Sequence, residues 1–166
     1  MLLGLGQARE GLARLERGLA ALRETGTVSG TPGLLISLAQ ARGMLGQPIE
    51  GLHCLDEARQ IIEATEERLD EAELHRMRGD LLLQTGDRGA AEASFREAIA
   101  LAQGQSAKLY ELRAATGLAR LWRDHGKEGE ARALLAPIYG WFIEGFEAPD
   151  LQDARAVLAE LQVRGR

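Results

Sequence analysis

Residues 75–87 read HRMRGDLLLQTGD, and the glycines at 79 and 86 in this stretch decide the fold. The tripeptide Arg78-Gly79-Asp80 could be a cell-adhesion loop, which requires an exposed turn and an extracellular protein. Alternatively, Gly79 lies inside a helix, where glycine costs about 1 kcal/mol relative to alanine and therefore indicates a close packing contact. The pattern of the remaining sequence favours the helix.

Small and apolar residues recur along the chain at a spacing of forty. Steps of forty from Gly86 give the turn glycines Gly6, Gly46, Gly86 and Gly126. Seven residues before the last three of these glycines are Ala39, Gly79 and Ala119. Three further series have the same spacing: Gly11, Gly51, Ala91 and Ala131; Leu15, Leu55, Phe95 and Leu135; Gly18, Ala58, Ala98 and Ile138. A register kept without insertions predicts a repeat of two helices per unit, with Gly79 where the paired helices cross.

The apolar spacing predicts helices over residues 7–24, 33–45, 49–64, 69–85, 88–103, 107–125, 128–145 and 150–162. We expect one helical-repeat domain over 1–166, with a partial repeat at 1–26, repeats at 32–66, 72–104 and 112–146, and a capping helix at 149–163. The outer face of the capping helix would carry polar residues, Asp153 among them, as the end of a repeat array requires.

The small residue at 79, Leu82, Gly86, Ala91, Phe95 and Ala98 together resemble the motif of the tetratricopeptide repeat. This resemblance covers nearly the whole chain and implies an all-α solenoid of αα-hairpins. It also implies that the first helices of the units line a concave surface that binds a protein or peptide. The family period is about 34 residues, and the extra residues here fall between units, around 65–68 and 104–108. His75 stands where the family motif often has tryptophan.

A narrower resemblance concerns three segments: 72–87, 111–127 and 139–161. They are similar to the C-terminal repeat region of bacterial multidomain adenylate or guanylate cyclases and of transcriptional regulators that carry an AAA-type ATPase. The implied function is a regulatory module of a bacterial signalling protein. The alternative is a small-ligand domain that senses an effector, which a deep enclosed pocket would favour over an open trough.

Composition excludes several other classes of function. The chain has 166 residues and a net charge of −5, so we expect no direct nucleic-acid binding. The sequence contains a single cysteine, Cys54, and lacks an apolar run long enough for a signal peptide or a membrane span, so we expect a cytoplasmic protein. The dinucleotide fingerprint fails after Gly6, and none of the three histidines has a second ligand at metal spacing. We expect neither an enzyme nor a cofactor.

The candidate partner-binding residues lie on the predicted first helices: Arg76, Asp80, Gln84, Arg113, Arg120 and Arg123. Three arginines on one helix suggest capture of an acidic segment, because guanidinium groups bind carboxylates in bidentate fashion. The alternative is pairing at i,i+4, which joins Arg76 to Asp80 and Arg120 to Asp124. Even then Arg113 and Arg123 would remain unpaired within their helix.

Two apolar clusters are candidate docking surfaces. Leu12, Leu15 and Leu19 form a stripe on a second-type helix whose first helix is missing from the sequence. We expect this stripe to meet an upstream domain or, in the isolated chain, to form a symmetric homodimer. The second cluster is Trp141, Phe142 and Phe146, which either pack the capping helix or dock another domain.

Overall fold

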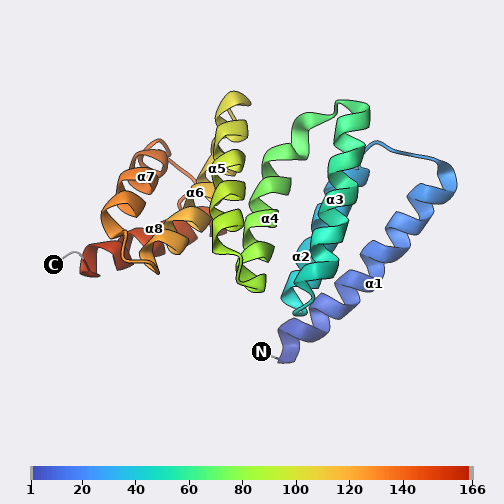
Figure 1. Cartoon of the computed structure of the whole chain (residues 1–166), viewed down its shortest axis with the longest axis horizontal. Helices are drawn as coiled ribbons and strands as arrows, with labels where there is room; N and C mark the ends of the chain where they lie inside the picture. Colours follow the sequence, from blue (N-terminus) through green and yellow to red (C-terminus); the bar gives the residue numbers. More distant parts are fainter. Residues whose placement is uncertain (1, 165–166) are drawn as a thin grey trace.

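The computed structural model describes residues 2–164, with side chains described for residue 6 and residues 8–162. This part of the chain forms eight α-helices and one 3-10 helix, η1 (Arg68–Asp70). The α-helices are α1 (Leu2–Thr25), α2 (Thr31–Met44), α3 (Pro48–Thr65), α4 (Glu71–Thr85), α5 (Arg88–Gly104), α6 (Lys108–Arg123), α7 (Glu128–Gly140) and α8 (Pro149–Arg164). They stand side by side in chain order, so that the molecule is an elongated row with α1 and α8 near opposite ends (Figure 1).

Consecutive helices pair as hairpins: α2 with α3, α4 with α5, and α6 with α7. The first helices of successive units also touch, α2 against α4 and α4 against α6, while α1 packs on α2 and α8 packs on α6 and α7. This confirms the predicted all-α solenoid of αα-hairpins with a period of forty residues. Among the described residues, no helix is long and apolar enough to cross a membrane.

Gly79 lies buried inside α4, so the tripeptide at 78–80 is not an adhesion loop. A Cβ atom at Gly79 would lie 2.7 Å from the ring of Phe95 on α5, and one at Gly117 on α6 would lie 2.6 Å from the same ring. The Phe95 ring, which is completely buried, is therefore held between two glycine backbones. The predicted crossing is confirmed, and the other packing residues are also fully buried: Ala91, Ala98, Ala119, Ala131 and Leu135.

The turns between helices depend on residues with positive φ. Gly46, Gly86 and Gly126 adopt it at the turns inside the units, as predicted, whereas Gly6 lies within α1 because that helix already begins at Leu2. A second series of positive-φ residues has the same spacing of forty and could not be recognised from residue type. It occupies the turns between units and consists of Gly26, Glu66 and Ser106. Two of its members are not glycine, although the left-handed region is unfavourable for residues with a Cβ atom.

Replacing Ser106 with glycine should therefore raise the free energy of unfolding by about 0.5–1 kcal/mol. Ser106 has a φ of 55°, which is sterically costly for a residue with a Cβ atom, and glycine removes this cost. The gain exceeds the loss that comes from the greater entropy of glycine in the unfolded chain. Urea unfolding followed by circular dichroism would measure the change. Ser106→Ala is the matched control, and equal stability of the two variants would contradict the strain.

The structure corrects the predicted end of the helix at 128–145. α7 stops at Gly140, a poor helix former, and the chain then turns so that Phe142 packs against the core. Trp141 and Phe146 remain exposed, at 59% and 39% of their surface. Packing beneath the capping helix therefore accounts for Phe142 but not for Trp141.

The leucine stripe of α1 is only partly available to a partner. Leu19 is 7% exposed and belongs to the core formed with α2 and α3, so its expected role at a dimer edge is wrong. Leu12 and Leu15 are half-buried against the same core. Formation of a symmetric homodimer through this helix stays a prediction, limited to Leu12 and Leu15.

Candidate functional site

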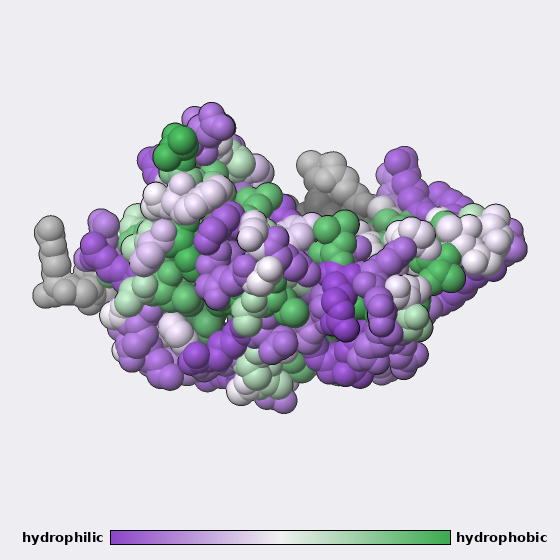
Figure 2. All heavy atoms as spheres, turned by 90° about the horizontal axis from the view of Figure 1, so that it is seen from above, coloured by the Kyte–Doolittle hydropathy of each residue, from purple (hydrophilic) through white to green (hydrophobic). Residues whose placement is uncertain are grey.

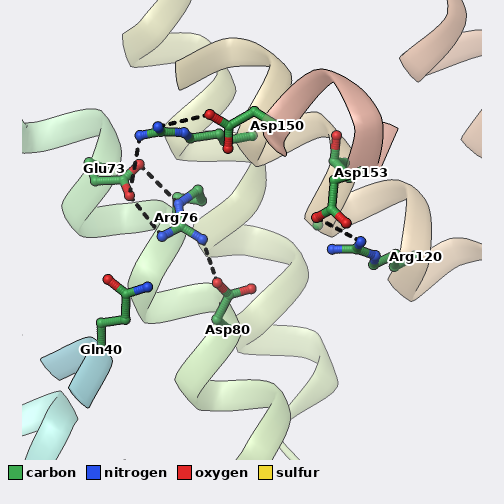
Figure 3. Close-up of a pocket in the computed structure, with 10 residues that line it drawn as sticks. Gln40, Glu73, Arg76, Asp80, Arg120, Asp150 and Asp153 are labelled. Carbon is green, nitrogen blue, oxygen red and sulfur yellow. Dashed lines mark hydrogen bonds and ion pairs between the residues drawn. The ribbon is translucent and has the colours of Figure 1, made fainter. Parts of the chain in front are cut away.

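A trough runs along the side of the solenoid that is lined by the first helices of the units. One cavity of this trough, of about 290 Å³, is lined by Gln40, Glu73, Arg76, Asp80, Arg113, Thr116, Gly117, Arg120, Asp150 and Asp153 (Figure 3). A second cavity of about 360 Å³ shares Gln40, Arg76 and Asp80 with the first and extends to Met44 and Gln84. The trough therefore crosses α2, α4, α6 and α8.

Arg76 lies at the centre of the trough and joins two carboxylates of its own helix. Its Nε donates to Glu73 Oε2 at 2.9 Å, its Nη2 donates to Glu73 Oε1 at 2.8 Å, and its Nη1 donates to Asp80 Oδ2. Only 16% of the Arg76 side chain is exposed. The predicted pairing with Asp80 is thus confirmed, and Glu73 is a second partner.

Burial and ion pairing act in opposite directions on the protonation of this cluster. Burial tends to lower the pKa of Arg76, but the hydrogen bonds and charges of Glu73 and Asp80 outweigh it, so that the pKa is raised. Burial raises the pKa of Asp80 above its usual value in spite of the neighbouring guanidinium group. The folded protein therefore tolerates the charge of Arg76 better than that of Asp80.

Arg113 connects the cluster to α8. Its Nη2 donates to Asp150 Oδ2 at 2.9 Å, and its Nη1 lies 4.0 Å from Glu73 Oε1. The hydrogen bond to Asp150 raises the pKa of Arg113. Ionic contacts therefore run continuously from α8 through α6 to α4.

The other two arginines of α6 also pair with α8. Arg120 Nη2 lies 2.8 Å from Asp153 Oδ2, so the expected pair of Arg120 with Asp124 is wrong. Arg123 donates to Asp124 at 2.8 Å and to Glu160, and it does not line the cavity. Its expected unpaired state is also wrong.

The contact of Arg123 with Asp124 is made by the next residue along the chain. The other contacts have one cause: α8 packs beside α6 and brings its own carboxylates to the arginines. Spacing within a single helix cannot show such contacts. Asp153, expected on the outer face of the capping helix, instead points toward the trough (Figure 3). A signal for it existed in the sequence, since Gly33, Glu73, Arg113 and Asp153 continue the spacing of forty.

Three arginines alone would make the trough electropositive, but the trough also contains carboxylates. Its lining contains four carboxylates and three guanidinium groups, which leaves a net charge of −1. The four predicted residues Arg76, Asp80, Arg113 and Arg120 are brought together in the first cavity, while Gln84 lies in the second one.

The described residues contain no cluster of His, Cys, Asp and Glu that could hold a metal ion. Cys54 is half-buried, and Arg42 is a basic neighbour of its thiol. Burial nevertheless raises the pKa of the Cys54 thiol, so that the thiol is not activated.

Comparison with known proteins agrees with this architecture. Residues 30–104 match the family model of the tetratricopeptide repeat, a repeat that generally binds proteins or peptides and is typically non-catalytic. A similar solved structure is a variant of a Podosopora anserina protein described as a kinesin light chain with nearly identical TPR-like repeats. The likeness has a TM-score of 0.67 at 20% identity and covers 96% of this chain and 80% of the other. At this identity the likeness concerns the fold. No curated protein matches the chain.

Proposed function

We propose that the chain is a non-catalytic scaffold that binds a peptide segment of another protein in the trough between α2 and α8. The observation that carries this proposal is the trough itself, in which two adjoining cavities cross three repeat units and α8. A surface of this length suits an extended segment. Both cavities open to solvent, which disfavours the alternative of a small-ligand effector-sensing domain.

The charge of the bound segment can be inferred from the ion pair of the trough that a partner side chain could replace. Arg76 is nearly buried and held by two carboxylates, so it is not available to a partner. Arg120 and Asp153 are 41% and 57% exposed, and such a pair contributes at most about 1 kcal/mol. An acidic side chain of a partner could therefore replace Asp153 on Arg120. We propose that the trough accepts an acidic segment at this position.

The cellular role is the less direct part of the proposal. The resemblance of segments 72–87, 111–127 and 139–161 to repeat regions of bacterial cyclases and transcriptional regulators supports a cytoplasmic regulatory module. In such a module the repeats would bind a partner and thereby bias an output domain. Co-purification with a tagged chain would identify that partner.

Binding of an acidic peptide should depend on Arg120 and Asp153 in opposite directions. Arg120→Glu should weaken binding at least about tenfold, because it replaces attraction by repulsion. Asp153→Asn should strengthen it, because it removes the competing carboxylate. Fluorescence anisotropy with labelled Asp/Glu-rich peptides, and with charge-reversed peptides for comparison, would measure both effects across a salt series.

Arg155→Glu is the matched control, since Arg155 is an exposed arginine of α8 that does not line the trough. It should leave binding unchanged. The proposal of an acidic segment fails if acidic and basic peptides bind equally or if Arg120→Glu has no effect.

A further inference from the structure

The turns between repeat units lie along one edge of the solenoid, at the top of Figure 1. The large apolar side chains exposed on this edge include Leu69 at 76%, Leu109 at 39%, Trp141 at 59% and Ile143 at 90%. Leu69 and Leu109 occupy the same position in successive units, forty residues apart. We call these four residues the turn edge. Figure 2 views the molecule from this side and shows apolar atoms as separate patches on a mainly hydrophilic surface.

Contacts between neighbouring turns hold the segments that carry these side chains next to one another. The Nε2 atom of Gln105 donates to the carbonyl oxygen of Arg68 at 2.7 Å, which joins the turn that carries Leu69 to the next turn. The Nζ atom of Lys108, which precedes Leu109, lies 5.9 Å from the centre of the Trp141 ring. These contacts join the three turns that carry Leu69, Leu109 and Trp141, and the apolar side chains form separate patches along them.

The exposure of Trp141 and Ile143 is not required by the fold. Phe142, which lies between them, packs against the core and anchors this segment. Its ring meets that of Trp141 edge-on, with centroids 5.2 Å apart. Exposed apolar residues that cluster in this way mark an interaction surface, and tryptophan is enriched among residues that dominate binding energy.

The charges around the turn edge define the partner. Glu66, Glu67, Glu144 and Glu147 are exposed, and none forms an ion pair with another described residue. The two basic residues of these turns are already paired, Arg68 with Glu71 at 3.2 Å and Lys108 with the buried Glu111 at 2.7 Å. The surface around the apolar residues is therefore acidic.

We propose that the turn edge binds an amphipathic helical segment of a partner protein, with apolar residues on one face and lysine or arginine beside them. The apolar face would cover the exposed leucines, Trp141 and Ile143, and the basic residues would meet the four free carboxylates. This surface is separate from the trough, and its partner has the opposite charge. The acidic surround also opposes binding to an anionic membrane.

A synthetic helical peptide with leucine at i, i+3, i+4 and i+7 and lysine elsewhere is a suitable probe. The sequence contains two tryptophans, Trp122 and Trp141. In the Trp122→Phe variant Trp141 remains, and its fluorescence reports binding. The emission should shift to shorter wavelength and saturate as peptide is added, because the peptide removes the Trp141 ring from water. Added salt should weaken the binding.

Substitutions on the edge should act on both parts of the recognition. Ile143→Ser combined with Leu69→Ser should raise the dissociation constant at least about tenfold, and Glu144→Gln combined with Glu147→Gln should raise it about threefold. Ile49→Ser is the matched control, because Ile49 is 52% exposed but lies at the turn inside a unit, on the opposite edge. Arg120→Glu should leave this binding unchanged, which separates it from binding in the trough.

Three results would overturn the proposal. A peptide with glutamate in place of lysine that binds equally well would exclude the role of charge. Self-association in light scattering that Ile143→Ser abolishes would make a second copy of this chain the occupant. Binding to phosphatidylcholine vesicles with one-quarter phosphatidylserine, lost in the same variant, would make it a membrane surface.

Discussion

Replacing Phe95 with alanine should lower the free energy of unfolding by about 3–5 kcal/mol. The Phe95 ring is completely buried and touches the backbone of α4 at Gly79 and of α6 at Gly117. Its removal leaves a cavity that two helix backbones cannot fill without moving together. Urea unfolding monitored by circular dichroism would measure the loss. A change below about 1 kcal/mol would contradict the tight packing of the Phe95 ring between α4 and α6.

The two glycines allow a sharper test of the same contact. Gly79→Ala places a methyl group within 2.8 Å of the ring of Phe95, so it should destabilise even though alanine is the better helix former. Phe95→Leu makes room, so the double variant should recover part of the loss as a coupling energy. Gly104→Ala is the control, since a Cβ atom there meets nothing within 4 Å. Purely additive effects of Gly79→Ala and Phe95→Leu would contradict direct contact.

Replacing Arg76 with methionine should lower the free energy of unfolding by about 1–3 kcal/mol. The change keeps an unbranched apolar stem but leaves the carboxylates of Glu73 and Asp80 close together without their shared guanidinium group. Removal of one partner from a largely buried pair leaves an uncompensated charge, which is the costly part. Chemical unfolding at neutral pH would measure the effect.

Asp80→Asn should cost less than Arg76→Met. Burial raises the pKa of Asp80, which means that the folded state already disfavours its charge, and Arg76 keeps Glu73 as a partner. Arg59→Met is the matched control, because Arg59 is 54% exposed and lies 3.9 Å from Glu63. We expect it to change stability by less than about 0.5 kcal/mol. If all three variants lose the same free energy, the ionic cluster has no special role.

Much of the architecture could be predicted from the sequence, because the repeat period is a local property of the chain. A small residue at 79 and a large one at 95 imply a crossing of two neighbouring helices, and the structure places them in contact. The helix boundaries were predicted less accurately where the turn between helices requires a residue with positive φ. Glu66 and Ser106 adopt left-handed geometry without being glycine, so residue type gave no warning. The end of α7 likewise depends on where Phe142 finds its packing site.

The candidate site was only partly predictable. Contacts within one helix follow from spacing, which is why the pair of Arg76 with Asp80 was predicted correctly. Contacts between helices depend on how far one helix slides along another, and no pattern within one helix contains that distance. The pairing of Arg113 with Asp150 and of Arg120 with Asp153 therefore became visible only in the folded chain.

The sequence by itself determined that this protein is a helical array with a period of forty, since repeated small and apolar positions can bury their surface only by stacking. Tertiary structure alone decided the electrostatics of the trough and the exposure of the turn edge. α8 carries carboxylates to the arginines of α6, and the segment that leads into α8 leaves Trp141 and Ile143 outside the core. The charge of the trough and the exposure of a side chain depend on all residues that lie nearby in space, and those residues come from different helices.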